Sequence, residues 1–458
     1  MRTGELGFWW RSLGGPPPPR APLSGTVEAD VAIVGGGYTG LWTAYYLKRA
    51  QPSLRIVVLE REVSGFGASG RNGGWVSGFF SGPPRAYERR AGRGSYAPLQ
   101  RAMFETVDEV GRVLAEEAID ADFIKAGQLG VALNRAQELR HRALIRDGRA
   151  HGVEEADLVE LSAEQTAARV RVAGACSATF SPHVARVHPA KLVRGLAASV
   201  ERLGVSIHEH TPVTATAAHR ALTPLGAVHA RWIVRATEGY TASLAGLRRA
   251  LVPMNSSMIV TEPLAATSWD AIGWSGSELI ADGAHVYVYL QRTEDGRIAI
   301  GGRGRPYRFG SRTDGAGETA GATIESLRGH LAEMFPAAAG AAIEHAWSGV
   351  LGVPRDWCPA VAADARSGLA WAGGYVGEGL AASNLAGRTL RDLILARDTP
   401  LTALAWVGRA PARWEPEPLR WAAIHAVYSL YRSADRSERR HGRPSRLGRL
   451  VDSASGRA

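Results

Sequence analysis

Three glycines near the amino terminus have the spacing of a phosphate-binding turn. Gly35, Gly37 and Gly40 stand between a short β-branched segment, 30–34, and a longer segment with helical periodicity, 38–50. The first glycine allows a tight turn, the second lets a pyrophosphate approach the backbone, and the third lets helix and strand pack closely. The helix then presents free amides and the positive end of its dipole to the phosphates. The sequence therefore predicts a dinucleotide-binding turn.

A carboxylate follows at the distance expected for a ribose contact. Residues 55–60 have the sequence RIVVLE, which predicts a second buried strand ending at Glu60, twenty residues after Gly40. From there the carboxylate can accept hydrogen bonds from ribose hydroxyls, and it would repel a 2′-phosphate. This disfavours NADP, although Arg61 lies beside Glu60.

Two further glycine-rich segments suit the same ligand. Residues 62–78 have the sequence EVSGFGASGRNGGWVSG, and residues 369–395 predict a strand, a glycine-rich turn and a long helix. Small residues with accessible amides suit a pyrophosphate and a flat ring that lies against the chain. A plain nicotinamide dehydrogenase rarely has so many glycines after its second strand. Both ends of the chain are therefore predicted to contact one cofactor.

A resemblance to a known superfamily extends over nearly the whole chain. It is carried by these segments and by two others, VHPAKLVRGLAASVERLGVSIHEHTPV (187–213) and RTEDGRIAIGGRGRPY (292–307). In content and order they resemble the FAD-dependent amine and amino-acid oxidoreductases of the D-amino-acid oxidase and glycine/sarcosine oxidase superfamily. Within it they are most similar to the gamma-glutamylputrescine oxidoreductase type. The resemblance implies an α/β fold, α+β overall, in which a Rossmann-like FAD-binding domain is joined to an antiparallel-sheet substrate domain.

The motifs and the resemblance together imply a set of FAD contacts. In relatives the residue equivalent to Val213 touches the adenine through its backbone, and a turn at Ala236-Thr237 would close over the cofactor. The expected contacts are Gly35, Gly37, Tyr38, Thr39, Gly40, Glu60, Arg61, Ala68, Ser69, Arg71, Asn72, Gly73, Gly74, Val213, Thr237, Gly374, Gly377, Gly379 and Leu380.

The flavin is expected to be bound without a covalent link. Sarcosine-oxidising relatives attach it through a cysteine near the segment SGVLGVP (348–354), which contains none here. Cys358 is the only cysteine near that segment, and a lone cysteine is most often a small buried packing residue. We therefore expect Cys358 to be part of the core.

The predicted elements suggest a chain that passes between the domains more than once. Strands are expected at 254–260, 285–290 and 297–301, the last two joined by the turn 294–296. The expected division is a leader at 1–27, an FAD-binding domain at 28–85, 150–240 and 345–398, a substrate domain at 86–149 and 241–344, and a basic helical extension at 399–458.

The basic extension is expected to contain an amphipathic helix at 418–442. Leu419, Ala423, Val427 and Leu430 would form its apolar stripe. Docking of this stripe on its own domain is favoured over a membrane surface or a second subunit.

The chemistry that the resemblance implies sets requirements for a substrate site. Oxidation of an amine by a flavin needs the neutral free base, held with its C–H bond aligned. An arginine fork would bind a substrate carboxylate. Arg292 is the first candidate, because relatives place such an arginine on the equivalent strand, and Arg303 is the second. Tyr289 shares a strand face with Tyr287, and Trp347 suits a pocket wall or the core equally well.

One difference from relatives narrows the class of substrate that we expect. Relatives that oxidise amino acids often have a second arginine before the late proline segment, where this chain has Gly-Val-Leu-Gly at 349–352. This disfavours a simple α-amino acid and favours an amine with a remote acid group or none. The expected reaction gives an imine and then a carbonyl compound, with O₂ reduced to H₂O₂. A quinone or carrier as electron acceptor, and a flavin-holding protein without turnover, are the alternatives.

Composition excludes several other classes. The net charge is +10, but the arginines are scattered, so no nucleic-acid partner is expected. No apolar run suits a membrane span and no signal peptide is recognisable, which indicates a cytoplasmic protein. Two distant cysteines and the isolated pair His183 and His188 predict neither a disulfide framework nor a metal site. Asp364 and Glu378, which flank the late glycine turn, are expected to be solvated.

Overall fold

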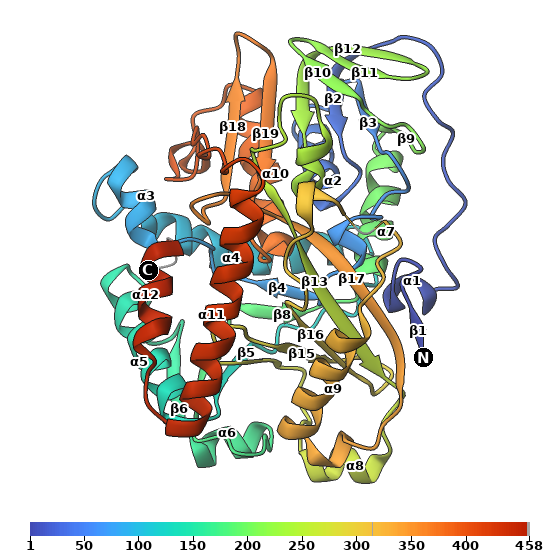
Figure 1. Ribbon diagram of the computed structural model, residues 1–458. Helices are drawn as coiled ribbons and strands as arrows, with labels where there is room; N and C mark the ends of the chain where they lie inside the picture. The colour runs from blue at the N-terminus through green and yellow to red at the C-terminus, as the bar shows by residue number, and fades with distance from the viewer. Residues whose placement is uncertain (314, 456–458) are drawn as a thin grey trace.

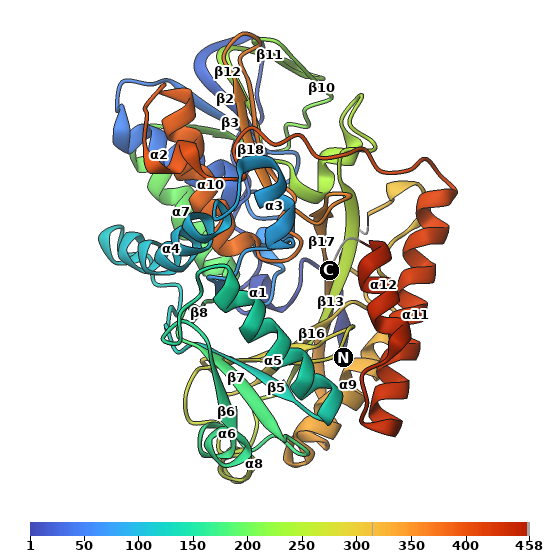
Figure 2. The same cartoon turned by 90° about the vertical axis from the view of Figure 1, so that its left-hand side faces the viewer.

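The computed structural model describes residues 1–313 and 315–455, and its first sheet carries the predicted nucleotide-binding motifs. The parallel strands of this sheet lie at the top of Figures 1 and 2. They run in the order β19 (Leu369–Gly373), β12 (Gly226–Arg235), β2 (Val27–Val34), β3 (Ile56–Leu59) and β9 (Ser206–His208). The antiparallel strands β10 (Ala215–Ala217), β11 (Arg220–Thr223) and β18 (Ala360–Asp364) complete its eight strands.

A second sheet, mostly antiparallel, lies below the first (Figure 2). Its nine strands run in the order β1 (Arg2–Thr3), β17 (Ile343–Val353), β13 (Val252–Thr261), β16 (Ile298–Gly302), β15 (Tyr289–Arg292), β14 (Leu279–Asp282), β5 (Gln128–Ala132), β7 (Ser177–Ser181) and β6 (Val159–Ser162). The pairs β1–β17 and β14–β5 are parallel. A two-stranded sheet of β4 (Trp75–Ser77) and β8 (Val184–Arg186) lies between the two large sheets (Figure 1).

Helices cover the parallel sheet, whose strand β3 is apolar throughout. All four residues of β3 are buried, as expected of a strand with both faces covered. α2 (Tyr38–Ala50) and α10 (Gly379–Ile394) pack on the sheet, with α7 (Pro189–Arg202) against α2 and α4 (Tyr96–Glu116) against α10. α10 packs so closely on α2 that a Cβ added to Gly387 would lie 2.8 Å from Trp42.

The other helices lie at the periphery and around the second sheet (Figures 1 and 2). They are α1 (Phe8–Arg11), α3 (Pro84–Ala91), α5 (Arg135–Ala150), α6 (Ala163–Arg169), α8 (Ala266–Ile272), α9 (Gly321–Met334), α11 (Leu419–His441) and α12 (Arg446–Ser455). In the described ranges, no helix combines the length and the apolar composition that a bilayer crossing requires.

The predicted mixed α/β fold is confirmed, and several elements have the predicted limits. α2 spans Tyr38–Ala50, and β15 and β16 form the predicted hairpin around 294–296. One strand differs, because the strand predicted at 285–290 begins only at Tyr289 and ends at Arg292. At the predicted Ala236-Thr237 turn, β12 ends at Arg235 and is followed by the 3₁₀ helix Glu238–Ser243.

Sheet pairing bears on the predicted division of the chain. β6 and β7, within 150–240, pair in the nine-stranded sheet and not in the nucleotide-binding sheet. The residues at 1–27 are more than a leader, because Trp9 and Trp10 of α1 are fully buried and β1 pairs with β17. The domain limits therefore stay a prediction, and we place β6 and β7 with the second sheet.

The extension docks on its own chain, but not by the predicted stripe. The buried face of α11 contains Ile424, Tyr428 and Tyr431, whereas Leu419 and Leu430 are 63% and 39% exposed. The prediction of the stripe was wrong because it counted aliphatic residues alone. Tyrosines carry more apolar surface, and their hydroxyl groups can still be satisfied at the edge of the contact.

Candidate active site

One cavity of about 770 Å³ lies between the two large sheets and brings most of the predicted FAD contacts together. Sixteen of the nineteen line it: Gly35, Gly37, Tyr38, Thr39, Glu60, Arg61, Ala68, Ser69, Arg71, Asn72, Gly73, Val213, Thr237, Gly377, Gly379 and Leu380. Gly40, Gly74 and Gly374 do not line it. Their roles as cofactor contacts stay a prediction.

The first glycine turn has the close approaches that its residue types imply. Gly35 has a φ of +112°, and a Cβ there would lie 2.5 Å from the carbonyl oxygen of Ala236. A Cβ on Gly40 would lie 2.0 Å from the carbonyl oxygen of Gly35. At Gly37 the nearest atom to such a Cβ is the Ser69 hydroxyl oxygen, at 2.9 Å. The side-chain position of Gly37 thus faces the cavity, where a phosphate would need space.

Glu60 is held in a fixed orientation at the cavity by backbone hydrogen bonds. Its carboxylate accepts the N–H groups of Gly36 at 2.7 Å and Glu62 at 3.0 Å. Burial raises its pKa, although these hydrogen bonds favour the ionised form. Beside it, Arg61 lies over the ring of Tyr240 at 5.1 Å. The Tyr240 hydroxyl is buried and has no hydrogen-bond partner among the described residues. This donor and the Glu60 acceptor suit the polar part of a dinucleotide.

The second glycine-rich segment is folded back on itself and against the first turn. The Ser69 hydroxyl accepts the N–H of Tyr38 at 2.9 Å. The Asn72 side chain donates to the carbonyl oxygen of Ser69 and accepts the N–H of Gly74 at 2.7 Å. Gln291 of β15 donates to the carbonyl oxygen of Gly73 at 2.6 Å. The segment is therefore fixed by both the nucleotide-binding helix and the second sheet.

Glu238 holds the late glycine turn, a role that the sequence analysis missed. Its carboxylate accepts the N–H groups of Gly352 at 3.1 Å, Gly374 at 2.7 Å and Tyr375 at 3.2 Å. Burial raises the pKa of Glu238 to about 7, against these three hydrogen bonds. The Tyr375 hydroxyl in turn contacts the Thr39 hydroxyl at 3.0 Å, which links both ends of the chain. The available signal was an acidic residue directly after the predicted turn at Ala236-Thr237.

Of the three predicted substrate-binding residues, Tyr289 and Arg303 line the cavity. The Tyr289 hydroxyl contacts the Ser256 hydroxyl at 3.0 Å. Arg303 donates from Nη2 to the carbonyl oxygen of Val376 at 3.3 Å, and its Nη1 is buried with no partner in the described part of the chain. A buried guanidinium nitrogen without an acceptor is costly unless a ligand supplies one.

Arg292 lies elsewhere, which corrects the order of the two arginine candidates. Its guanidinium donates to the carbonyl oxygen of Trp274 and lies over the ring of Trp269 at 4.2 Å. It is absent from the cavity lining. Side chains alternate along a strand, so Tyr289 and Gln291 point to one face of β15 and Arg292 to the other.

The structure also shows how Trp347 and Cys358 are packed. Trp347 donates from Nε1 to the carbonyl oxygen of Arg71 at 2.9 Å and packs on Trp9, so it is a core residue that holds the second glycine-rich segment. Cys358 is buried outside the cavity lining, and its thiol donates to the carbonyl oxygen of Asp356 at 3.2 Å. Burial raises the pKa of this thiol to about 11.

Glu378 was expected to be solvated, and the structure contradicts this. It lines the cavity beside Gly377 and Gly379. Burial raises the pKa of its carboxyl, opposed by a hydrogen bond with Ser77 and by the positive charge of Arg303. The prediction failed because glycine-rich turns are usually at the surface, whereas Glu378 is half-buried and lines the cavity between the two sheets. Asp364 is exposed, as expected.

The two histidines that were judged not to be ligands have protein partners. His183 contacts Asp157 at 2.8 Å and stacks on Phe104. His188 caps α7 by accepting the N–H of Lys191 at 3.2 Å.

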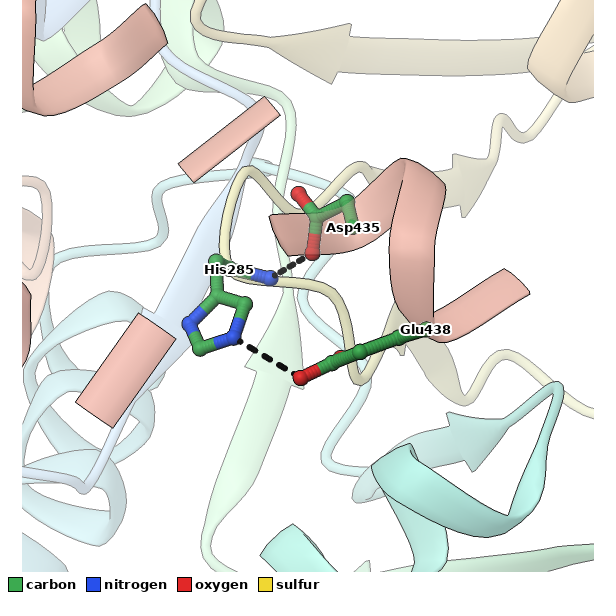
Figure 3. A group of neighbouring side chains, drawn as sticks. All are labelled: His285, Asp435 and Glu438. Atoms are coloured by element: carbon green, nitrogen blue, oxygen red, sulfur yellow. Dashed lines mark hydrogen bonds and ion pairs between the residues drawn. The ribbon is translucent and has the colours of Figure 1, made fainter. Parts of the chain in front are cut away.

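A different cluster, formed by His285, Asp435 and Glu438, brings potential metal ligands together (Figure 3). Asp435 accepts the backbone N–H groups of His285 at 2.8 Å and Val286 at 3.0 Å. Arg140 lies 2.6 Å from Glu438 and 2.8 Å from the ring of His285. These groups are therefore engaged with protein donors, and the cluster ties α11 to α5 and to the segment before β15.

Known proteins are similar to this chain in both sequence and fold. Residues 30–393 match the family described as FAD dependent oxidoreductase (DAO). A probable oxidoreductase OrdL of Rhizobium meliloti (strain 1021) is 27% identical over 444 residues, 94% of this chain and 98% of that protein. Gamma-glutamylputrescine oxidoreductase of Escherichia coli (strain K12) is 27% identical over 379 residues, 81% and 85% of the two chains.

Solved structures agree with the fold. Glycine oxidase from Geobacillus kaustophilus has a TM-score of 0.67 at 20% identity, over 81% of this chain and 96% of its own. L-proline dehydrogenase from P. horikoshii has a TM-score of 0.68 at 18% identity, over 82% and 96%. The match to the family covers far more than half of the chain and includes both glycine turns, Tyr289 of β15 and Arg303, which follows β16. The chain therefore belongs to the family of FAD dependent oxidoreductases.

Proposed function

We propose that this enzyme uses FAD to oxidise the C–N bond of an amine or amino acid. The observation that carries this proposal is the continuity of the cavity, which runs from the predicted FAD contacts onto the second sheet, where Tyr289 and Arg303 line it. The names of relatives support it, since they include gamma-glutamylputrescine oxidoreductase and a sarcosine oxidase subunit.

Bound FAD supplies the two-electron oxidation, by accepting a hydride from the carbon next to the substrate nitrogen. The chain's own residues bind and orient the substrate. The unpartnered Nη1 of Arg303 is placed to bind an acid group, and the aromatic rings of Tyr287 and Tyr289 form an apolar wall beside it. Water then hydrolyses the imine to a carbonyl compound. O₂ is the proposed electron acceptor, which is reduced to H₂O₂.

The cavity wall supports a substrate with no more than one acid group near Arg303. Gly349, Val350 and Leu351 line the cavity and offer no second cation. An amine with a remote carboxylate, or with none, therefore suits the site better than an α-amino acid held by two arginines.

Anaerobic bleaching tests the proposal. The yellow holoenzyme is mixed without oxygen with putrescine, N-acetylputrescine, gamma-glutamylputrescine, sarcosine and a set of D-amino acids. Loss of the flavin absorbance with one of them is the expected result, and a spectrum unchanged by the whole panel contradicts the proposal. Oxygen uptake with H₂O₂ release during turnover is then expected. Turnover with a quinone but not with O₂ would show that the electron acceptor is a quinone, and the proposed C–N oxidation would be unaffected.

A further inference from the structure

Among the described residues that line the cavity, Glu378 lies beside both the predicted cofactor contacts and Arg303 of the proposed substrate site. Glu378 is the residue before α10, so its neighbours Gly377 and Gly379 line the flavin side of the cavity. Arg303, which lines the same cavity, donates to the carbonyl oxygen of Val376, two residues before Glu378. The Ser77 hydroxyl is the hydrogen-bond partner of the Glu378 carboxyl.

The proposed reaction creates a need for such a group. An alkyl amine has a pKa near that of lysine, about 10.4, so at pH 7 only about one molecule in 10³ is the neutral free base. The nitrogen lone pair must be free when the adjacent C–H bond breaks, because the lone pair forms the new C=N bond. An ammonium that enters the cavity must therefore lose a proton before it can be oxidised.

We infer that Glu378 accepts this proton and is a catalytic base of the proposed amine oxidation, on which the inference rests. One N–H bond of the substrate ammonium breaks, and its electron pair remains on nitrogen as the lone pair. An O–H bond forms on the Glu378 carboxylate, so the positive charge of the substrate and the negative charge of the glutamate disappear together. No electrons are exchanged in this step.

The other acidic residues that line the cavity are less suited to accept the proton of the substrate ammonium. Glu60 and Glu238 are occupied by backbone N–H groups, and Asp282 accepts the N–H of Val288 at 2.8 Å. Asp147 lies on α5, away from the predicted flavin contacts.

The surroundings of Glu378 also suit a group that gains and loses a proton. Burial raises its pKa, while the hydrogen bond from Ser77 and the charge of Arg303 keep the ionised form accessible. Besides Glu378, the titratable groups that act on Arg303 are Tyr428 of α11, Tyr287 just before β15 and Tyr289 at the start of β15. Tyrosine side chains are neutral at pH 7, so Arg303 is the charged neighbour that acts on Glu378.

The pH dependence of flavin reduction tests the inference. Anaerobic stopped-flow reduction is measured from pH 6 to pH 10 with the amine that bleaches the wild type fastest in the panel above. With a carboxylate base, the second-order rate constant of the wild type reaches a plateau above the pKa of Glu378. In Glu378→Gln the plateau is lost, and the rate constant rises about tenfold per pH unit toward the substrate pKa. The expected deficit is about 100-fold at pH 7 and closes toward pH 10.

Two variants accompany Glu378→Gln. Glu378→Asp keeps a carboxylate and is expected to restore the plateau at a reduced level. Asp364→Asn, at the exposed end of β18, keeps the wild-type profile. The flavin spectrum and Tm of each variant establish that it is folded and loaded.

The experiment separates a failure of the proposed function from a failure of the inference about Glu378. If no amine bleaches the wild type, the proposed function fails and the inference falls with it. If amines bleach it but Glu378→Gln has the wild-type profile, only the inference fails. A loss in Glu378→Gln that is equal at every pH would also overturn it, because Glu378 would then only neutralise Arg303.

Discussion

At Gly37 the cavity itself makes a side chain intolerable. Only the Ser69 hydroxyl lies within 3 Å of a Cβ built there, so Gly37→Val can fold, but its methyl groups would occupy the space of the pyrophosphate. We expect this variant to be purified without bound FAD, measured as the ratio of absorbance at 450 nm and 280 nm. Gly329→Val is the matched control, since a Cβ on Gly329 has open space around it. Yellow Gly37→Val protein would remove the turn from the cofactor site.

Glu60 is predicted to hold the adenosine ribose, and its carboxylate already faces the cavity. We expect Glu60→Ala to weaken FAD binding by about 1.5–3 kcal/mol, the usual loss for hydrogen bonds to a charged group. Titration of the apoprotein with FAD measures the Kd. Glu62→Ala, two residues further on, is the control and keeps the wild-type Kd. Equal Kd values for the two variants would place the ribose contact elsewhere.

Cys358 bears on how the flavin is held. Its thiol is buried outside the cavity lining, and its raised pKa of about 11 keeps it protonated and a poor nucleophile at neutral pH. We expect acid precipitation of the holoenzyme to leave a yellow supernatant over a white pellet. Colour that remains in the wild-type pellet and leaves it in Cys358→Ser would show a covalent link.

At the scale of elements, strand alternation and the late glycine turn arrange the site. β15 presents Tyr289 to the cavity and Arg292 to the opposite face. The turn after β19 depends on Glu238, whose carboxylate accepts N–H groups from Gly352 and Gly374 and so joins β17 to β19.

Glu238 makes the stability of this junction pH-dependent. Its folded pKa of about 7 lies above the ordinary value of 4.5, so the folded chain retains a proton that the unfolded chain releases. Its contribution to stability is fully present below pH 4.5 and is lost as the pH rises to about 7. Gln does not titrate, so we expect the Tm of the wild type, minus that of Glu238→Gln, to fall between pH 5 and pH 8. A difference that is constant or grows with pH would contradict this assignment.

For the whole molecule, α11 connects the extension to the substrate side of the fold. It lies along the outside of the second sheet in both views (Figures 1 and 2). The cluster of Figure 3 is its polar attachment, and Ile424, Tyr428 and Tyr431 are its apolar one.

Glu438 should control how firmly α11 is attached. Burial opposes its ionisation, but hydrogen bonds with His285, the N–H of Ser445 and Arg140 outweigh burial and lower its pKa to about 2. Its contribution is therefore present above the ordinary pKa of 4.5 and is lost as the pH falls toward 2. We expect Glu438→Ala to cost about 2 kcal/mol at pH 7. Differential scanning calorimetry measures it, and faster proteolysis within 419–441 locates it.

The exposed Arg440 of the same helix provides the comparison for that measurement. Arg440→Gln is expected to change neither Tm nor proteolysis. If Glu438→Ala behaves in the same way, the polar cluster does not hold the helix.

The sequence by itself determined the parts of this protein that depend on neighbours along the chain. The glycine turn at 35–40, the limits of α2 and the hairpin at 294–296 follow from local periodicity and backbone conformation, which a few consecutive residues set. The family resemblance followed from the order of such local motifs.

Only the tertiary structure decided which side chains meet. Arg303 and not Arg292 reaches the cavity, Glu378 is half-buried in the cavity wall, and α11 docks by its tyrosines rather than its leucines. Each of these outcomes depends on which face of a strand, turn or helix another part of the chain covers. Which face is buried depends on contacts between residues far apart in the sequence, so it cannot be predicted from the local pattern.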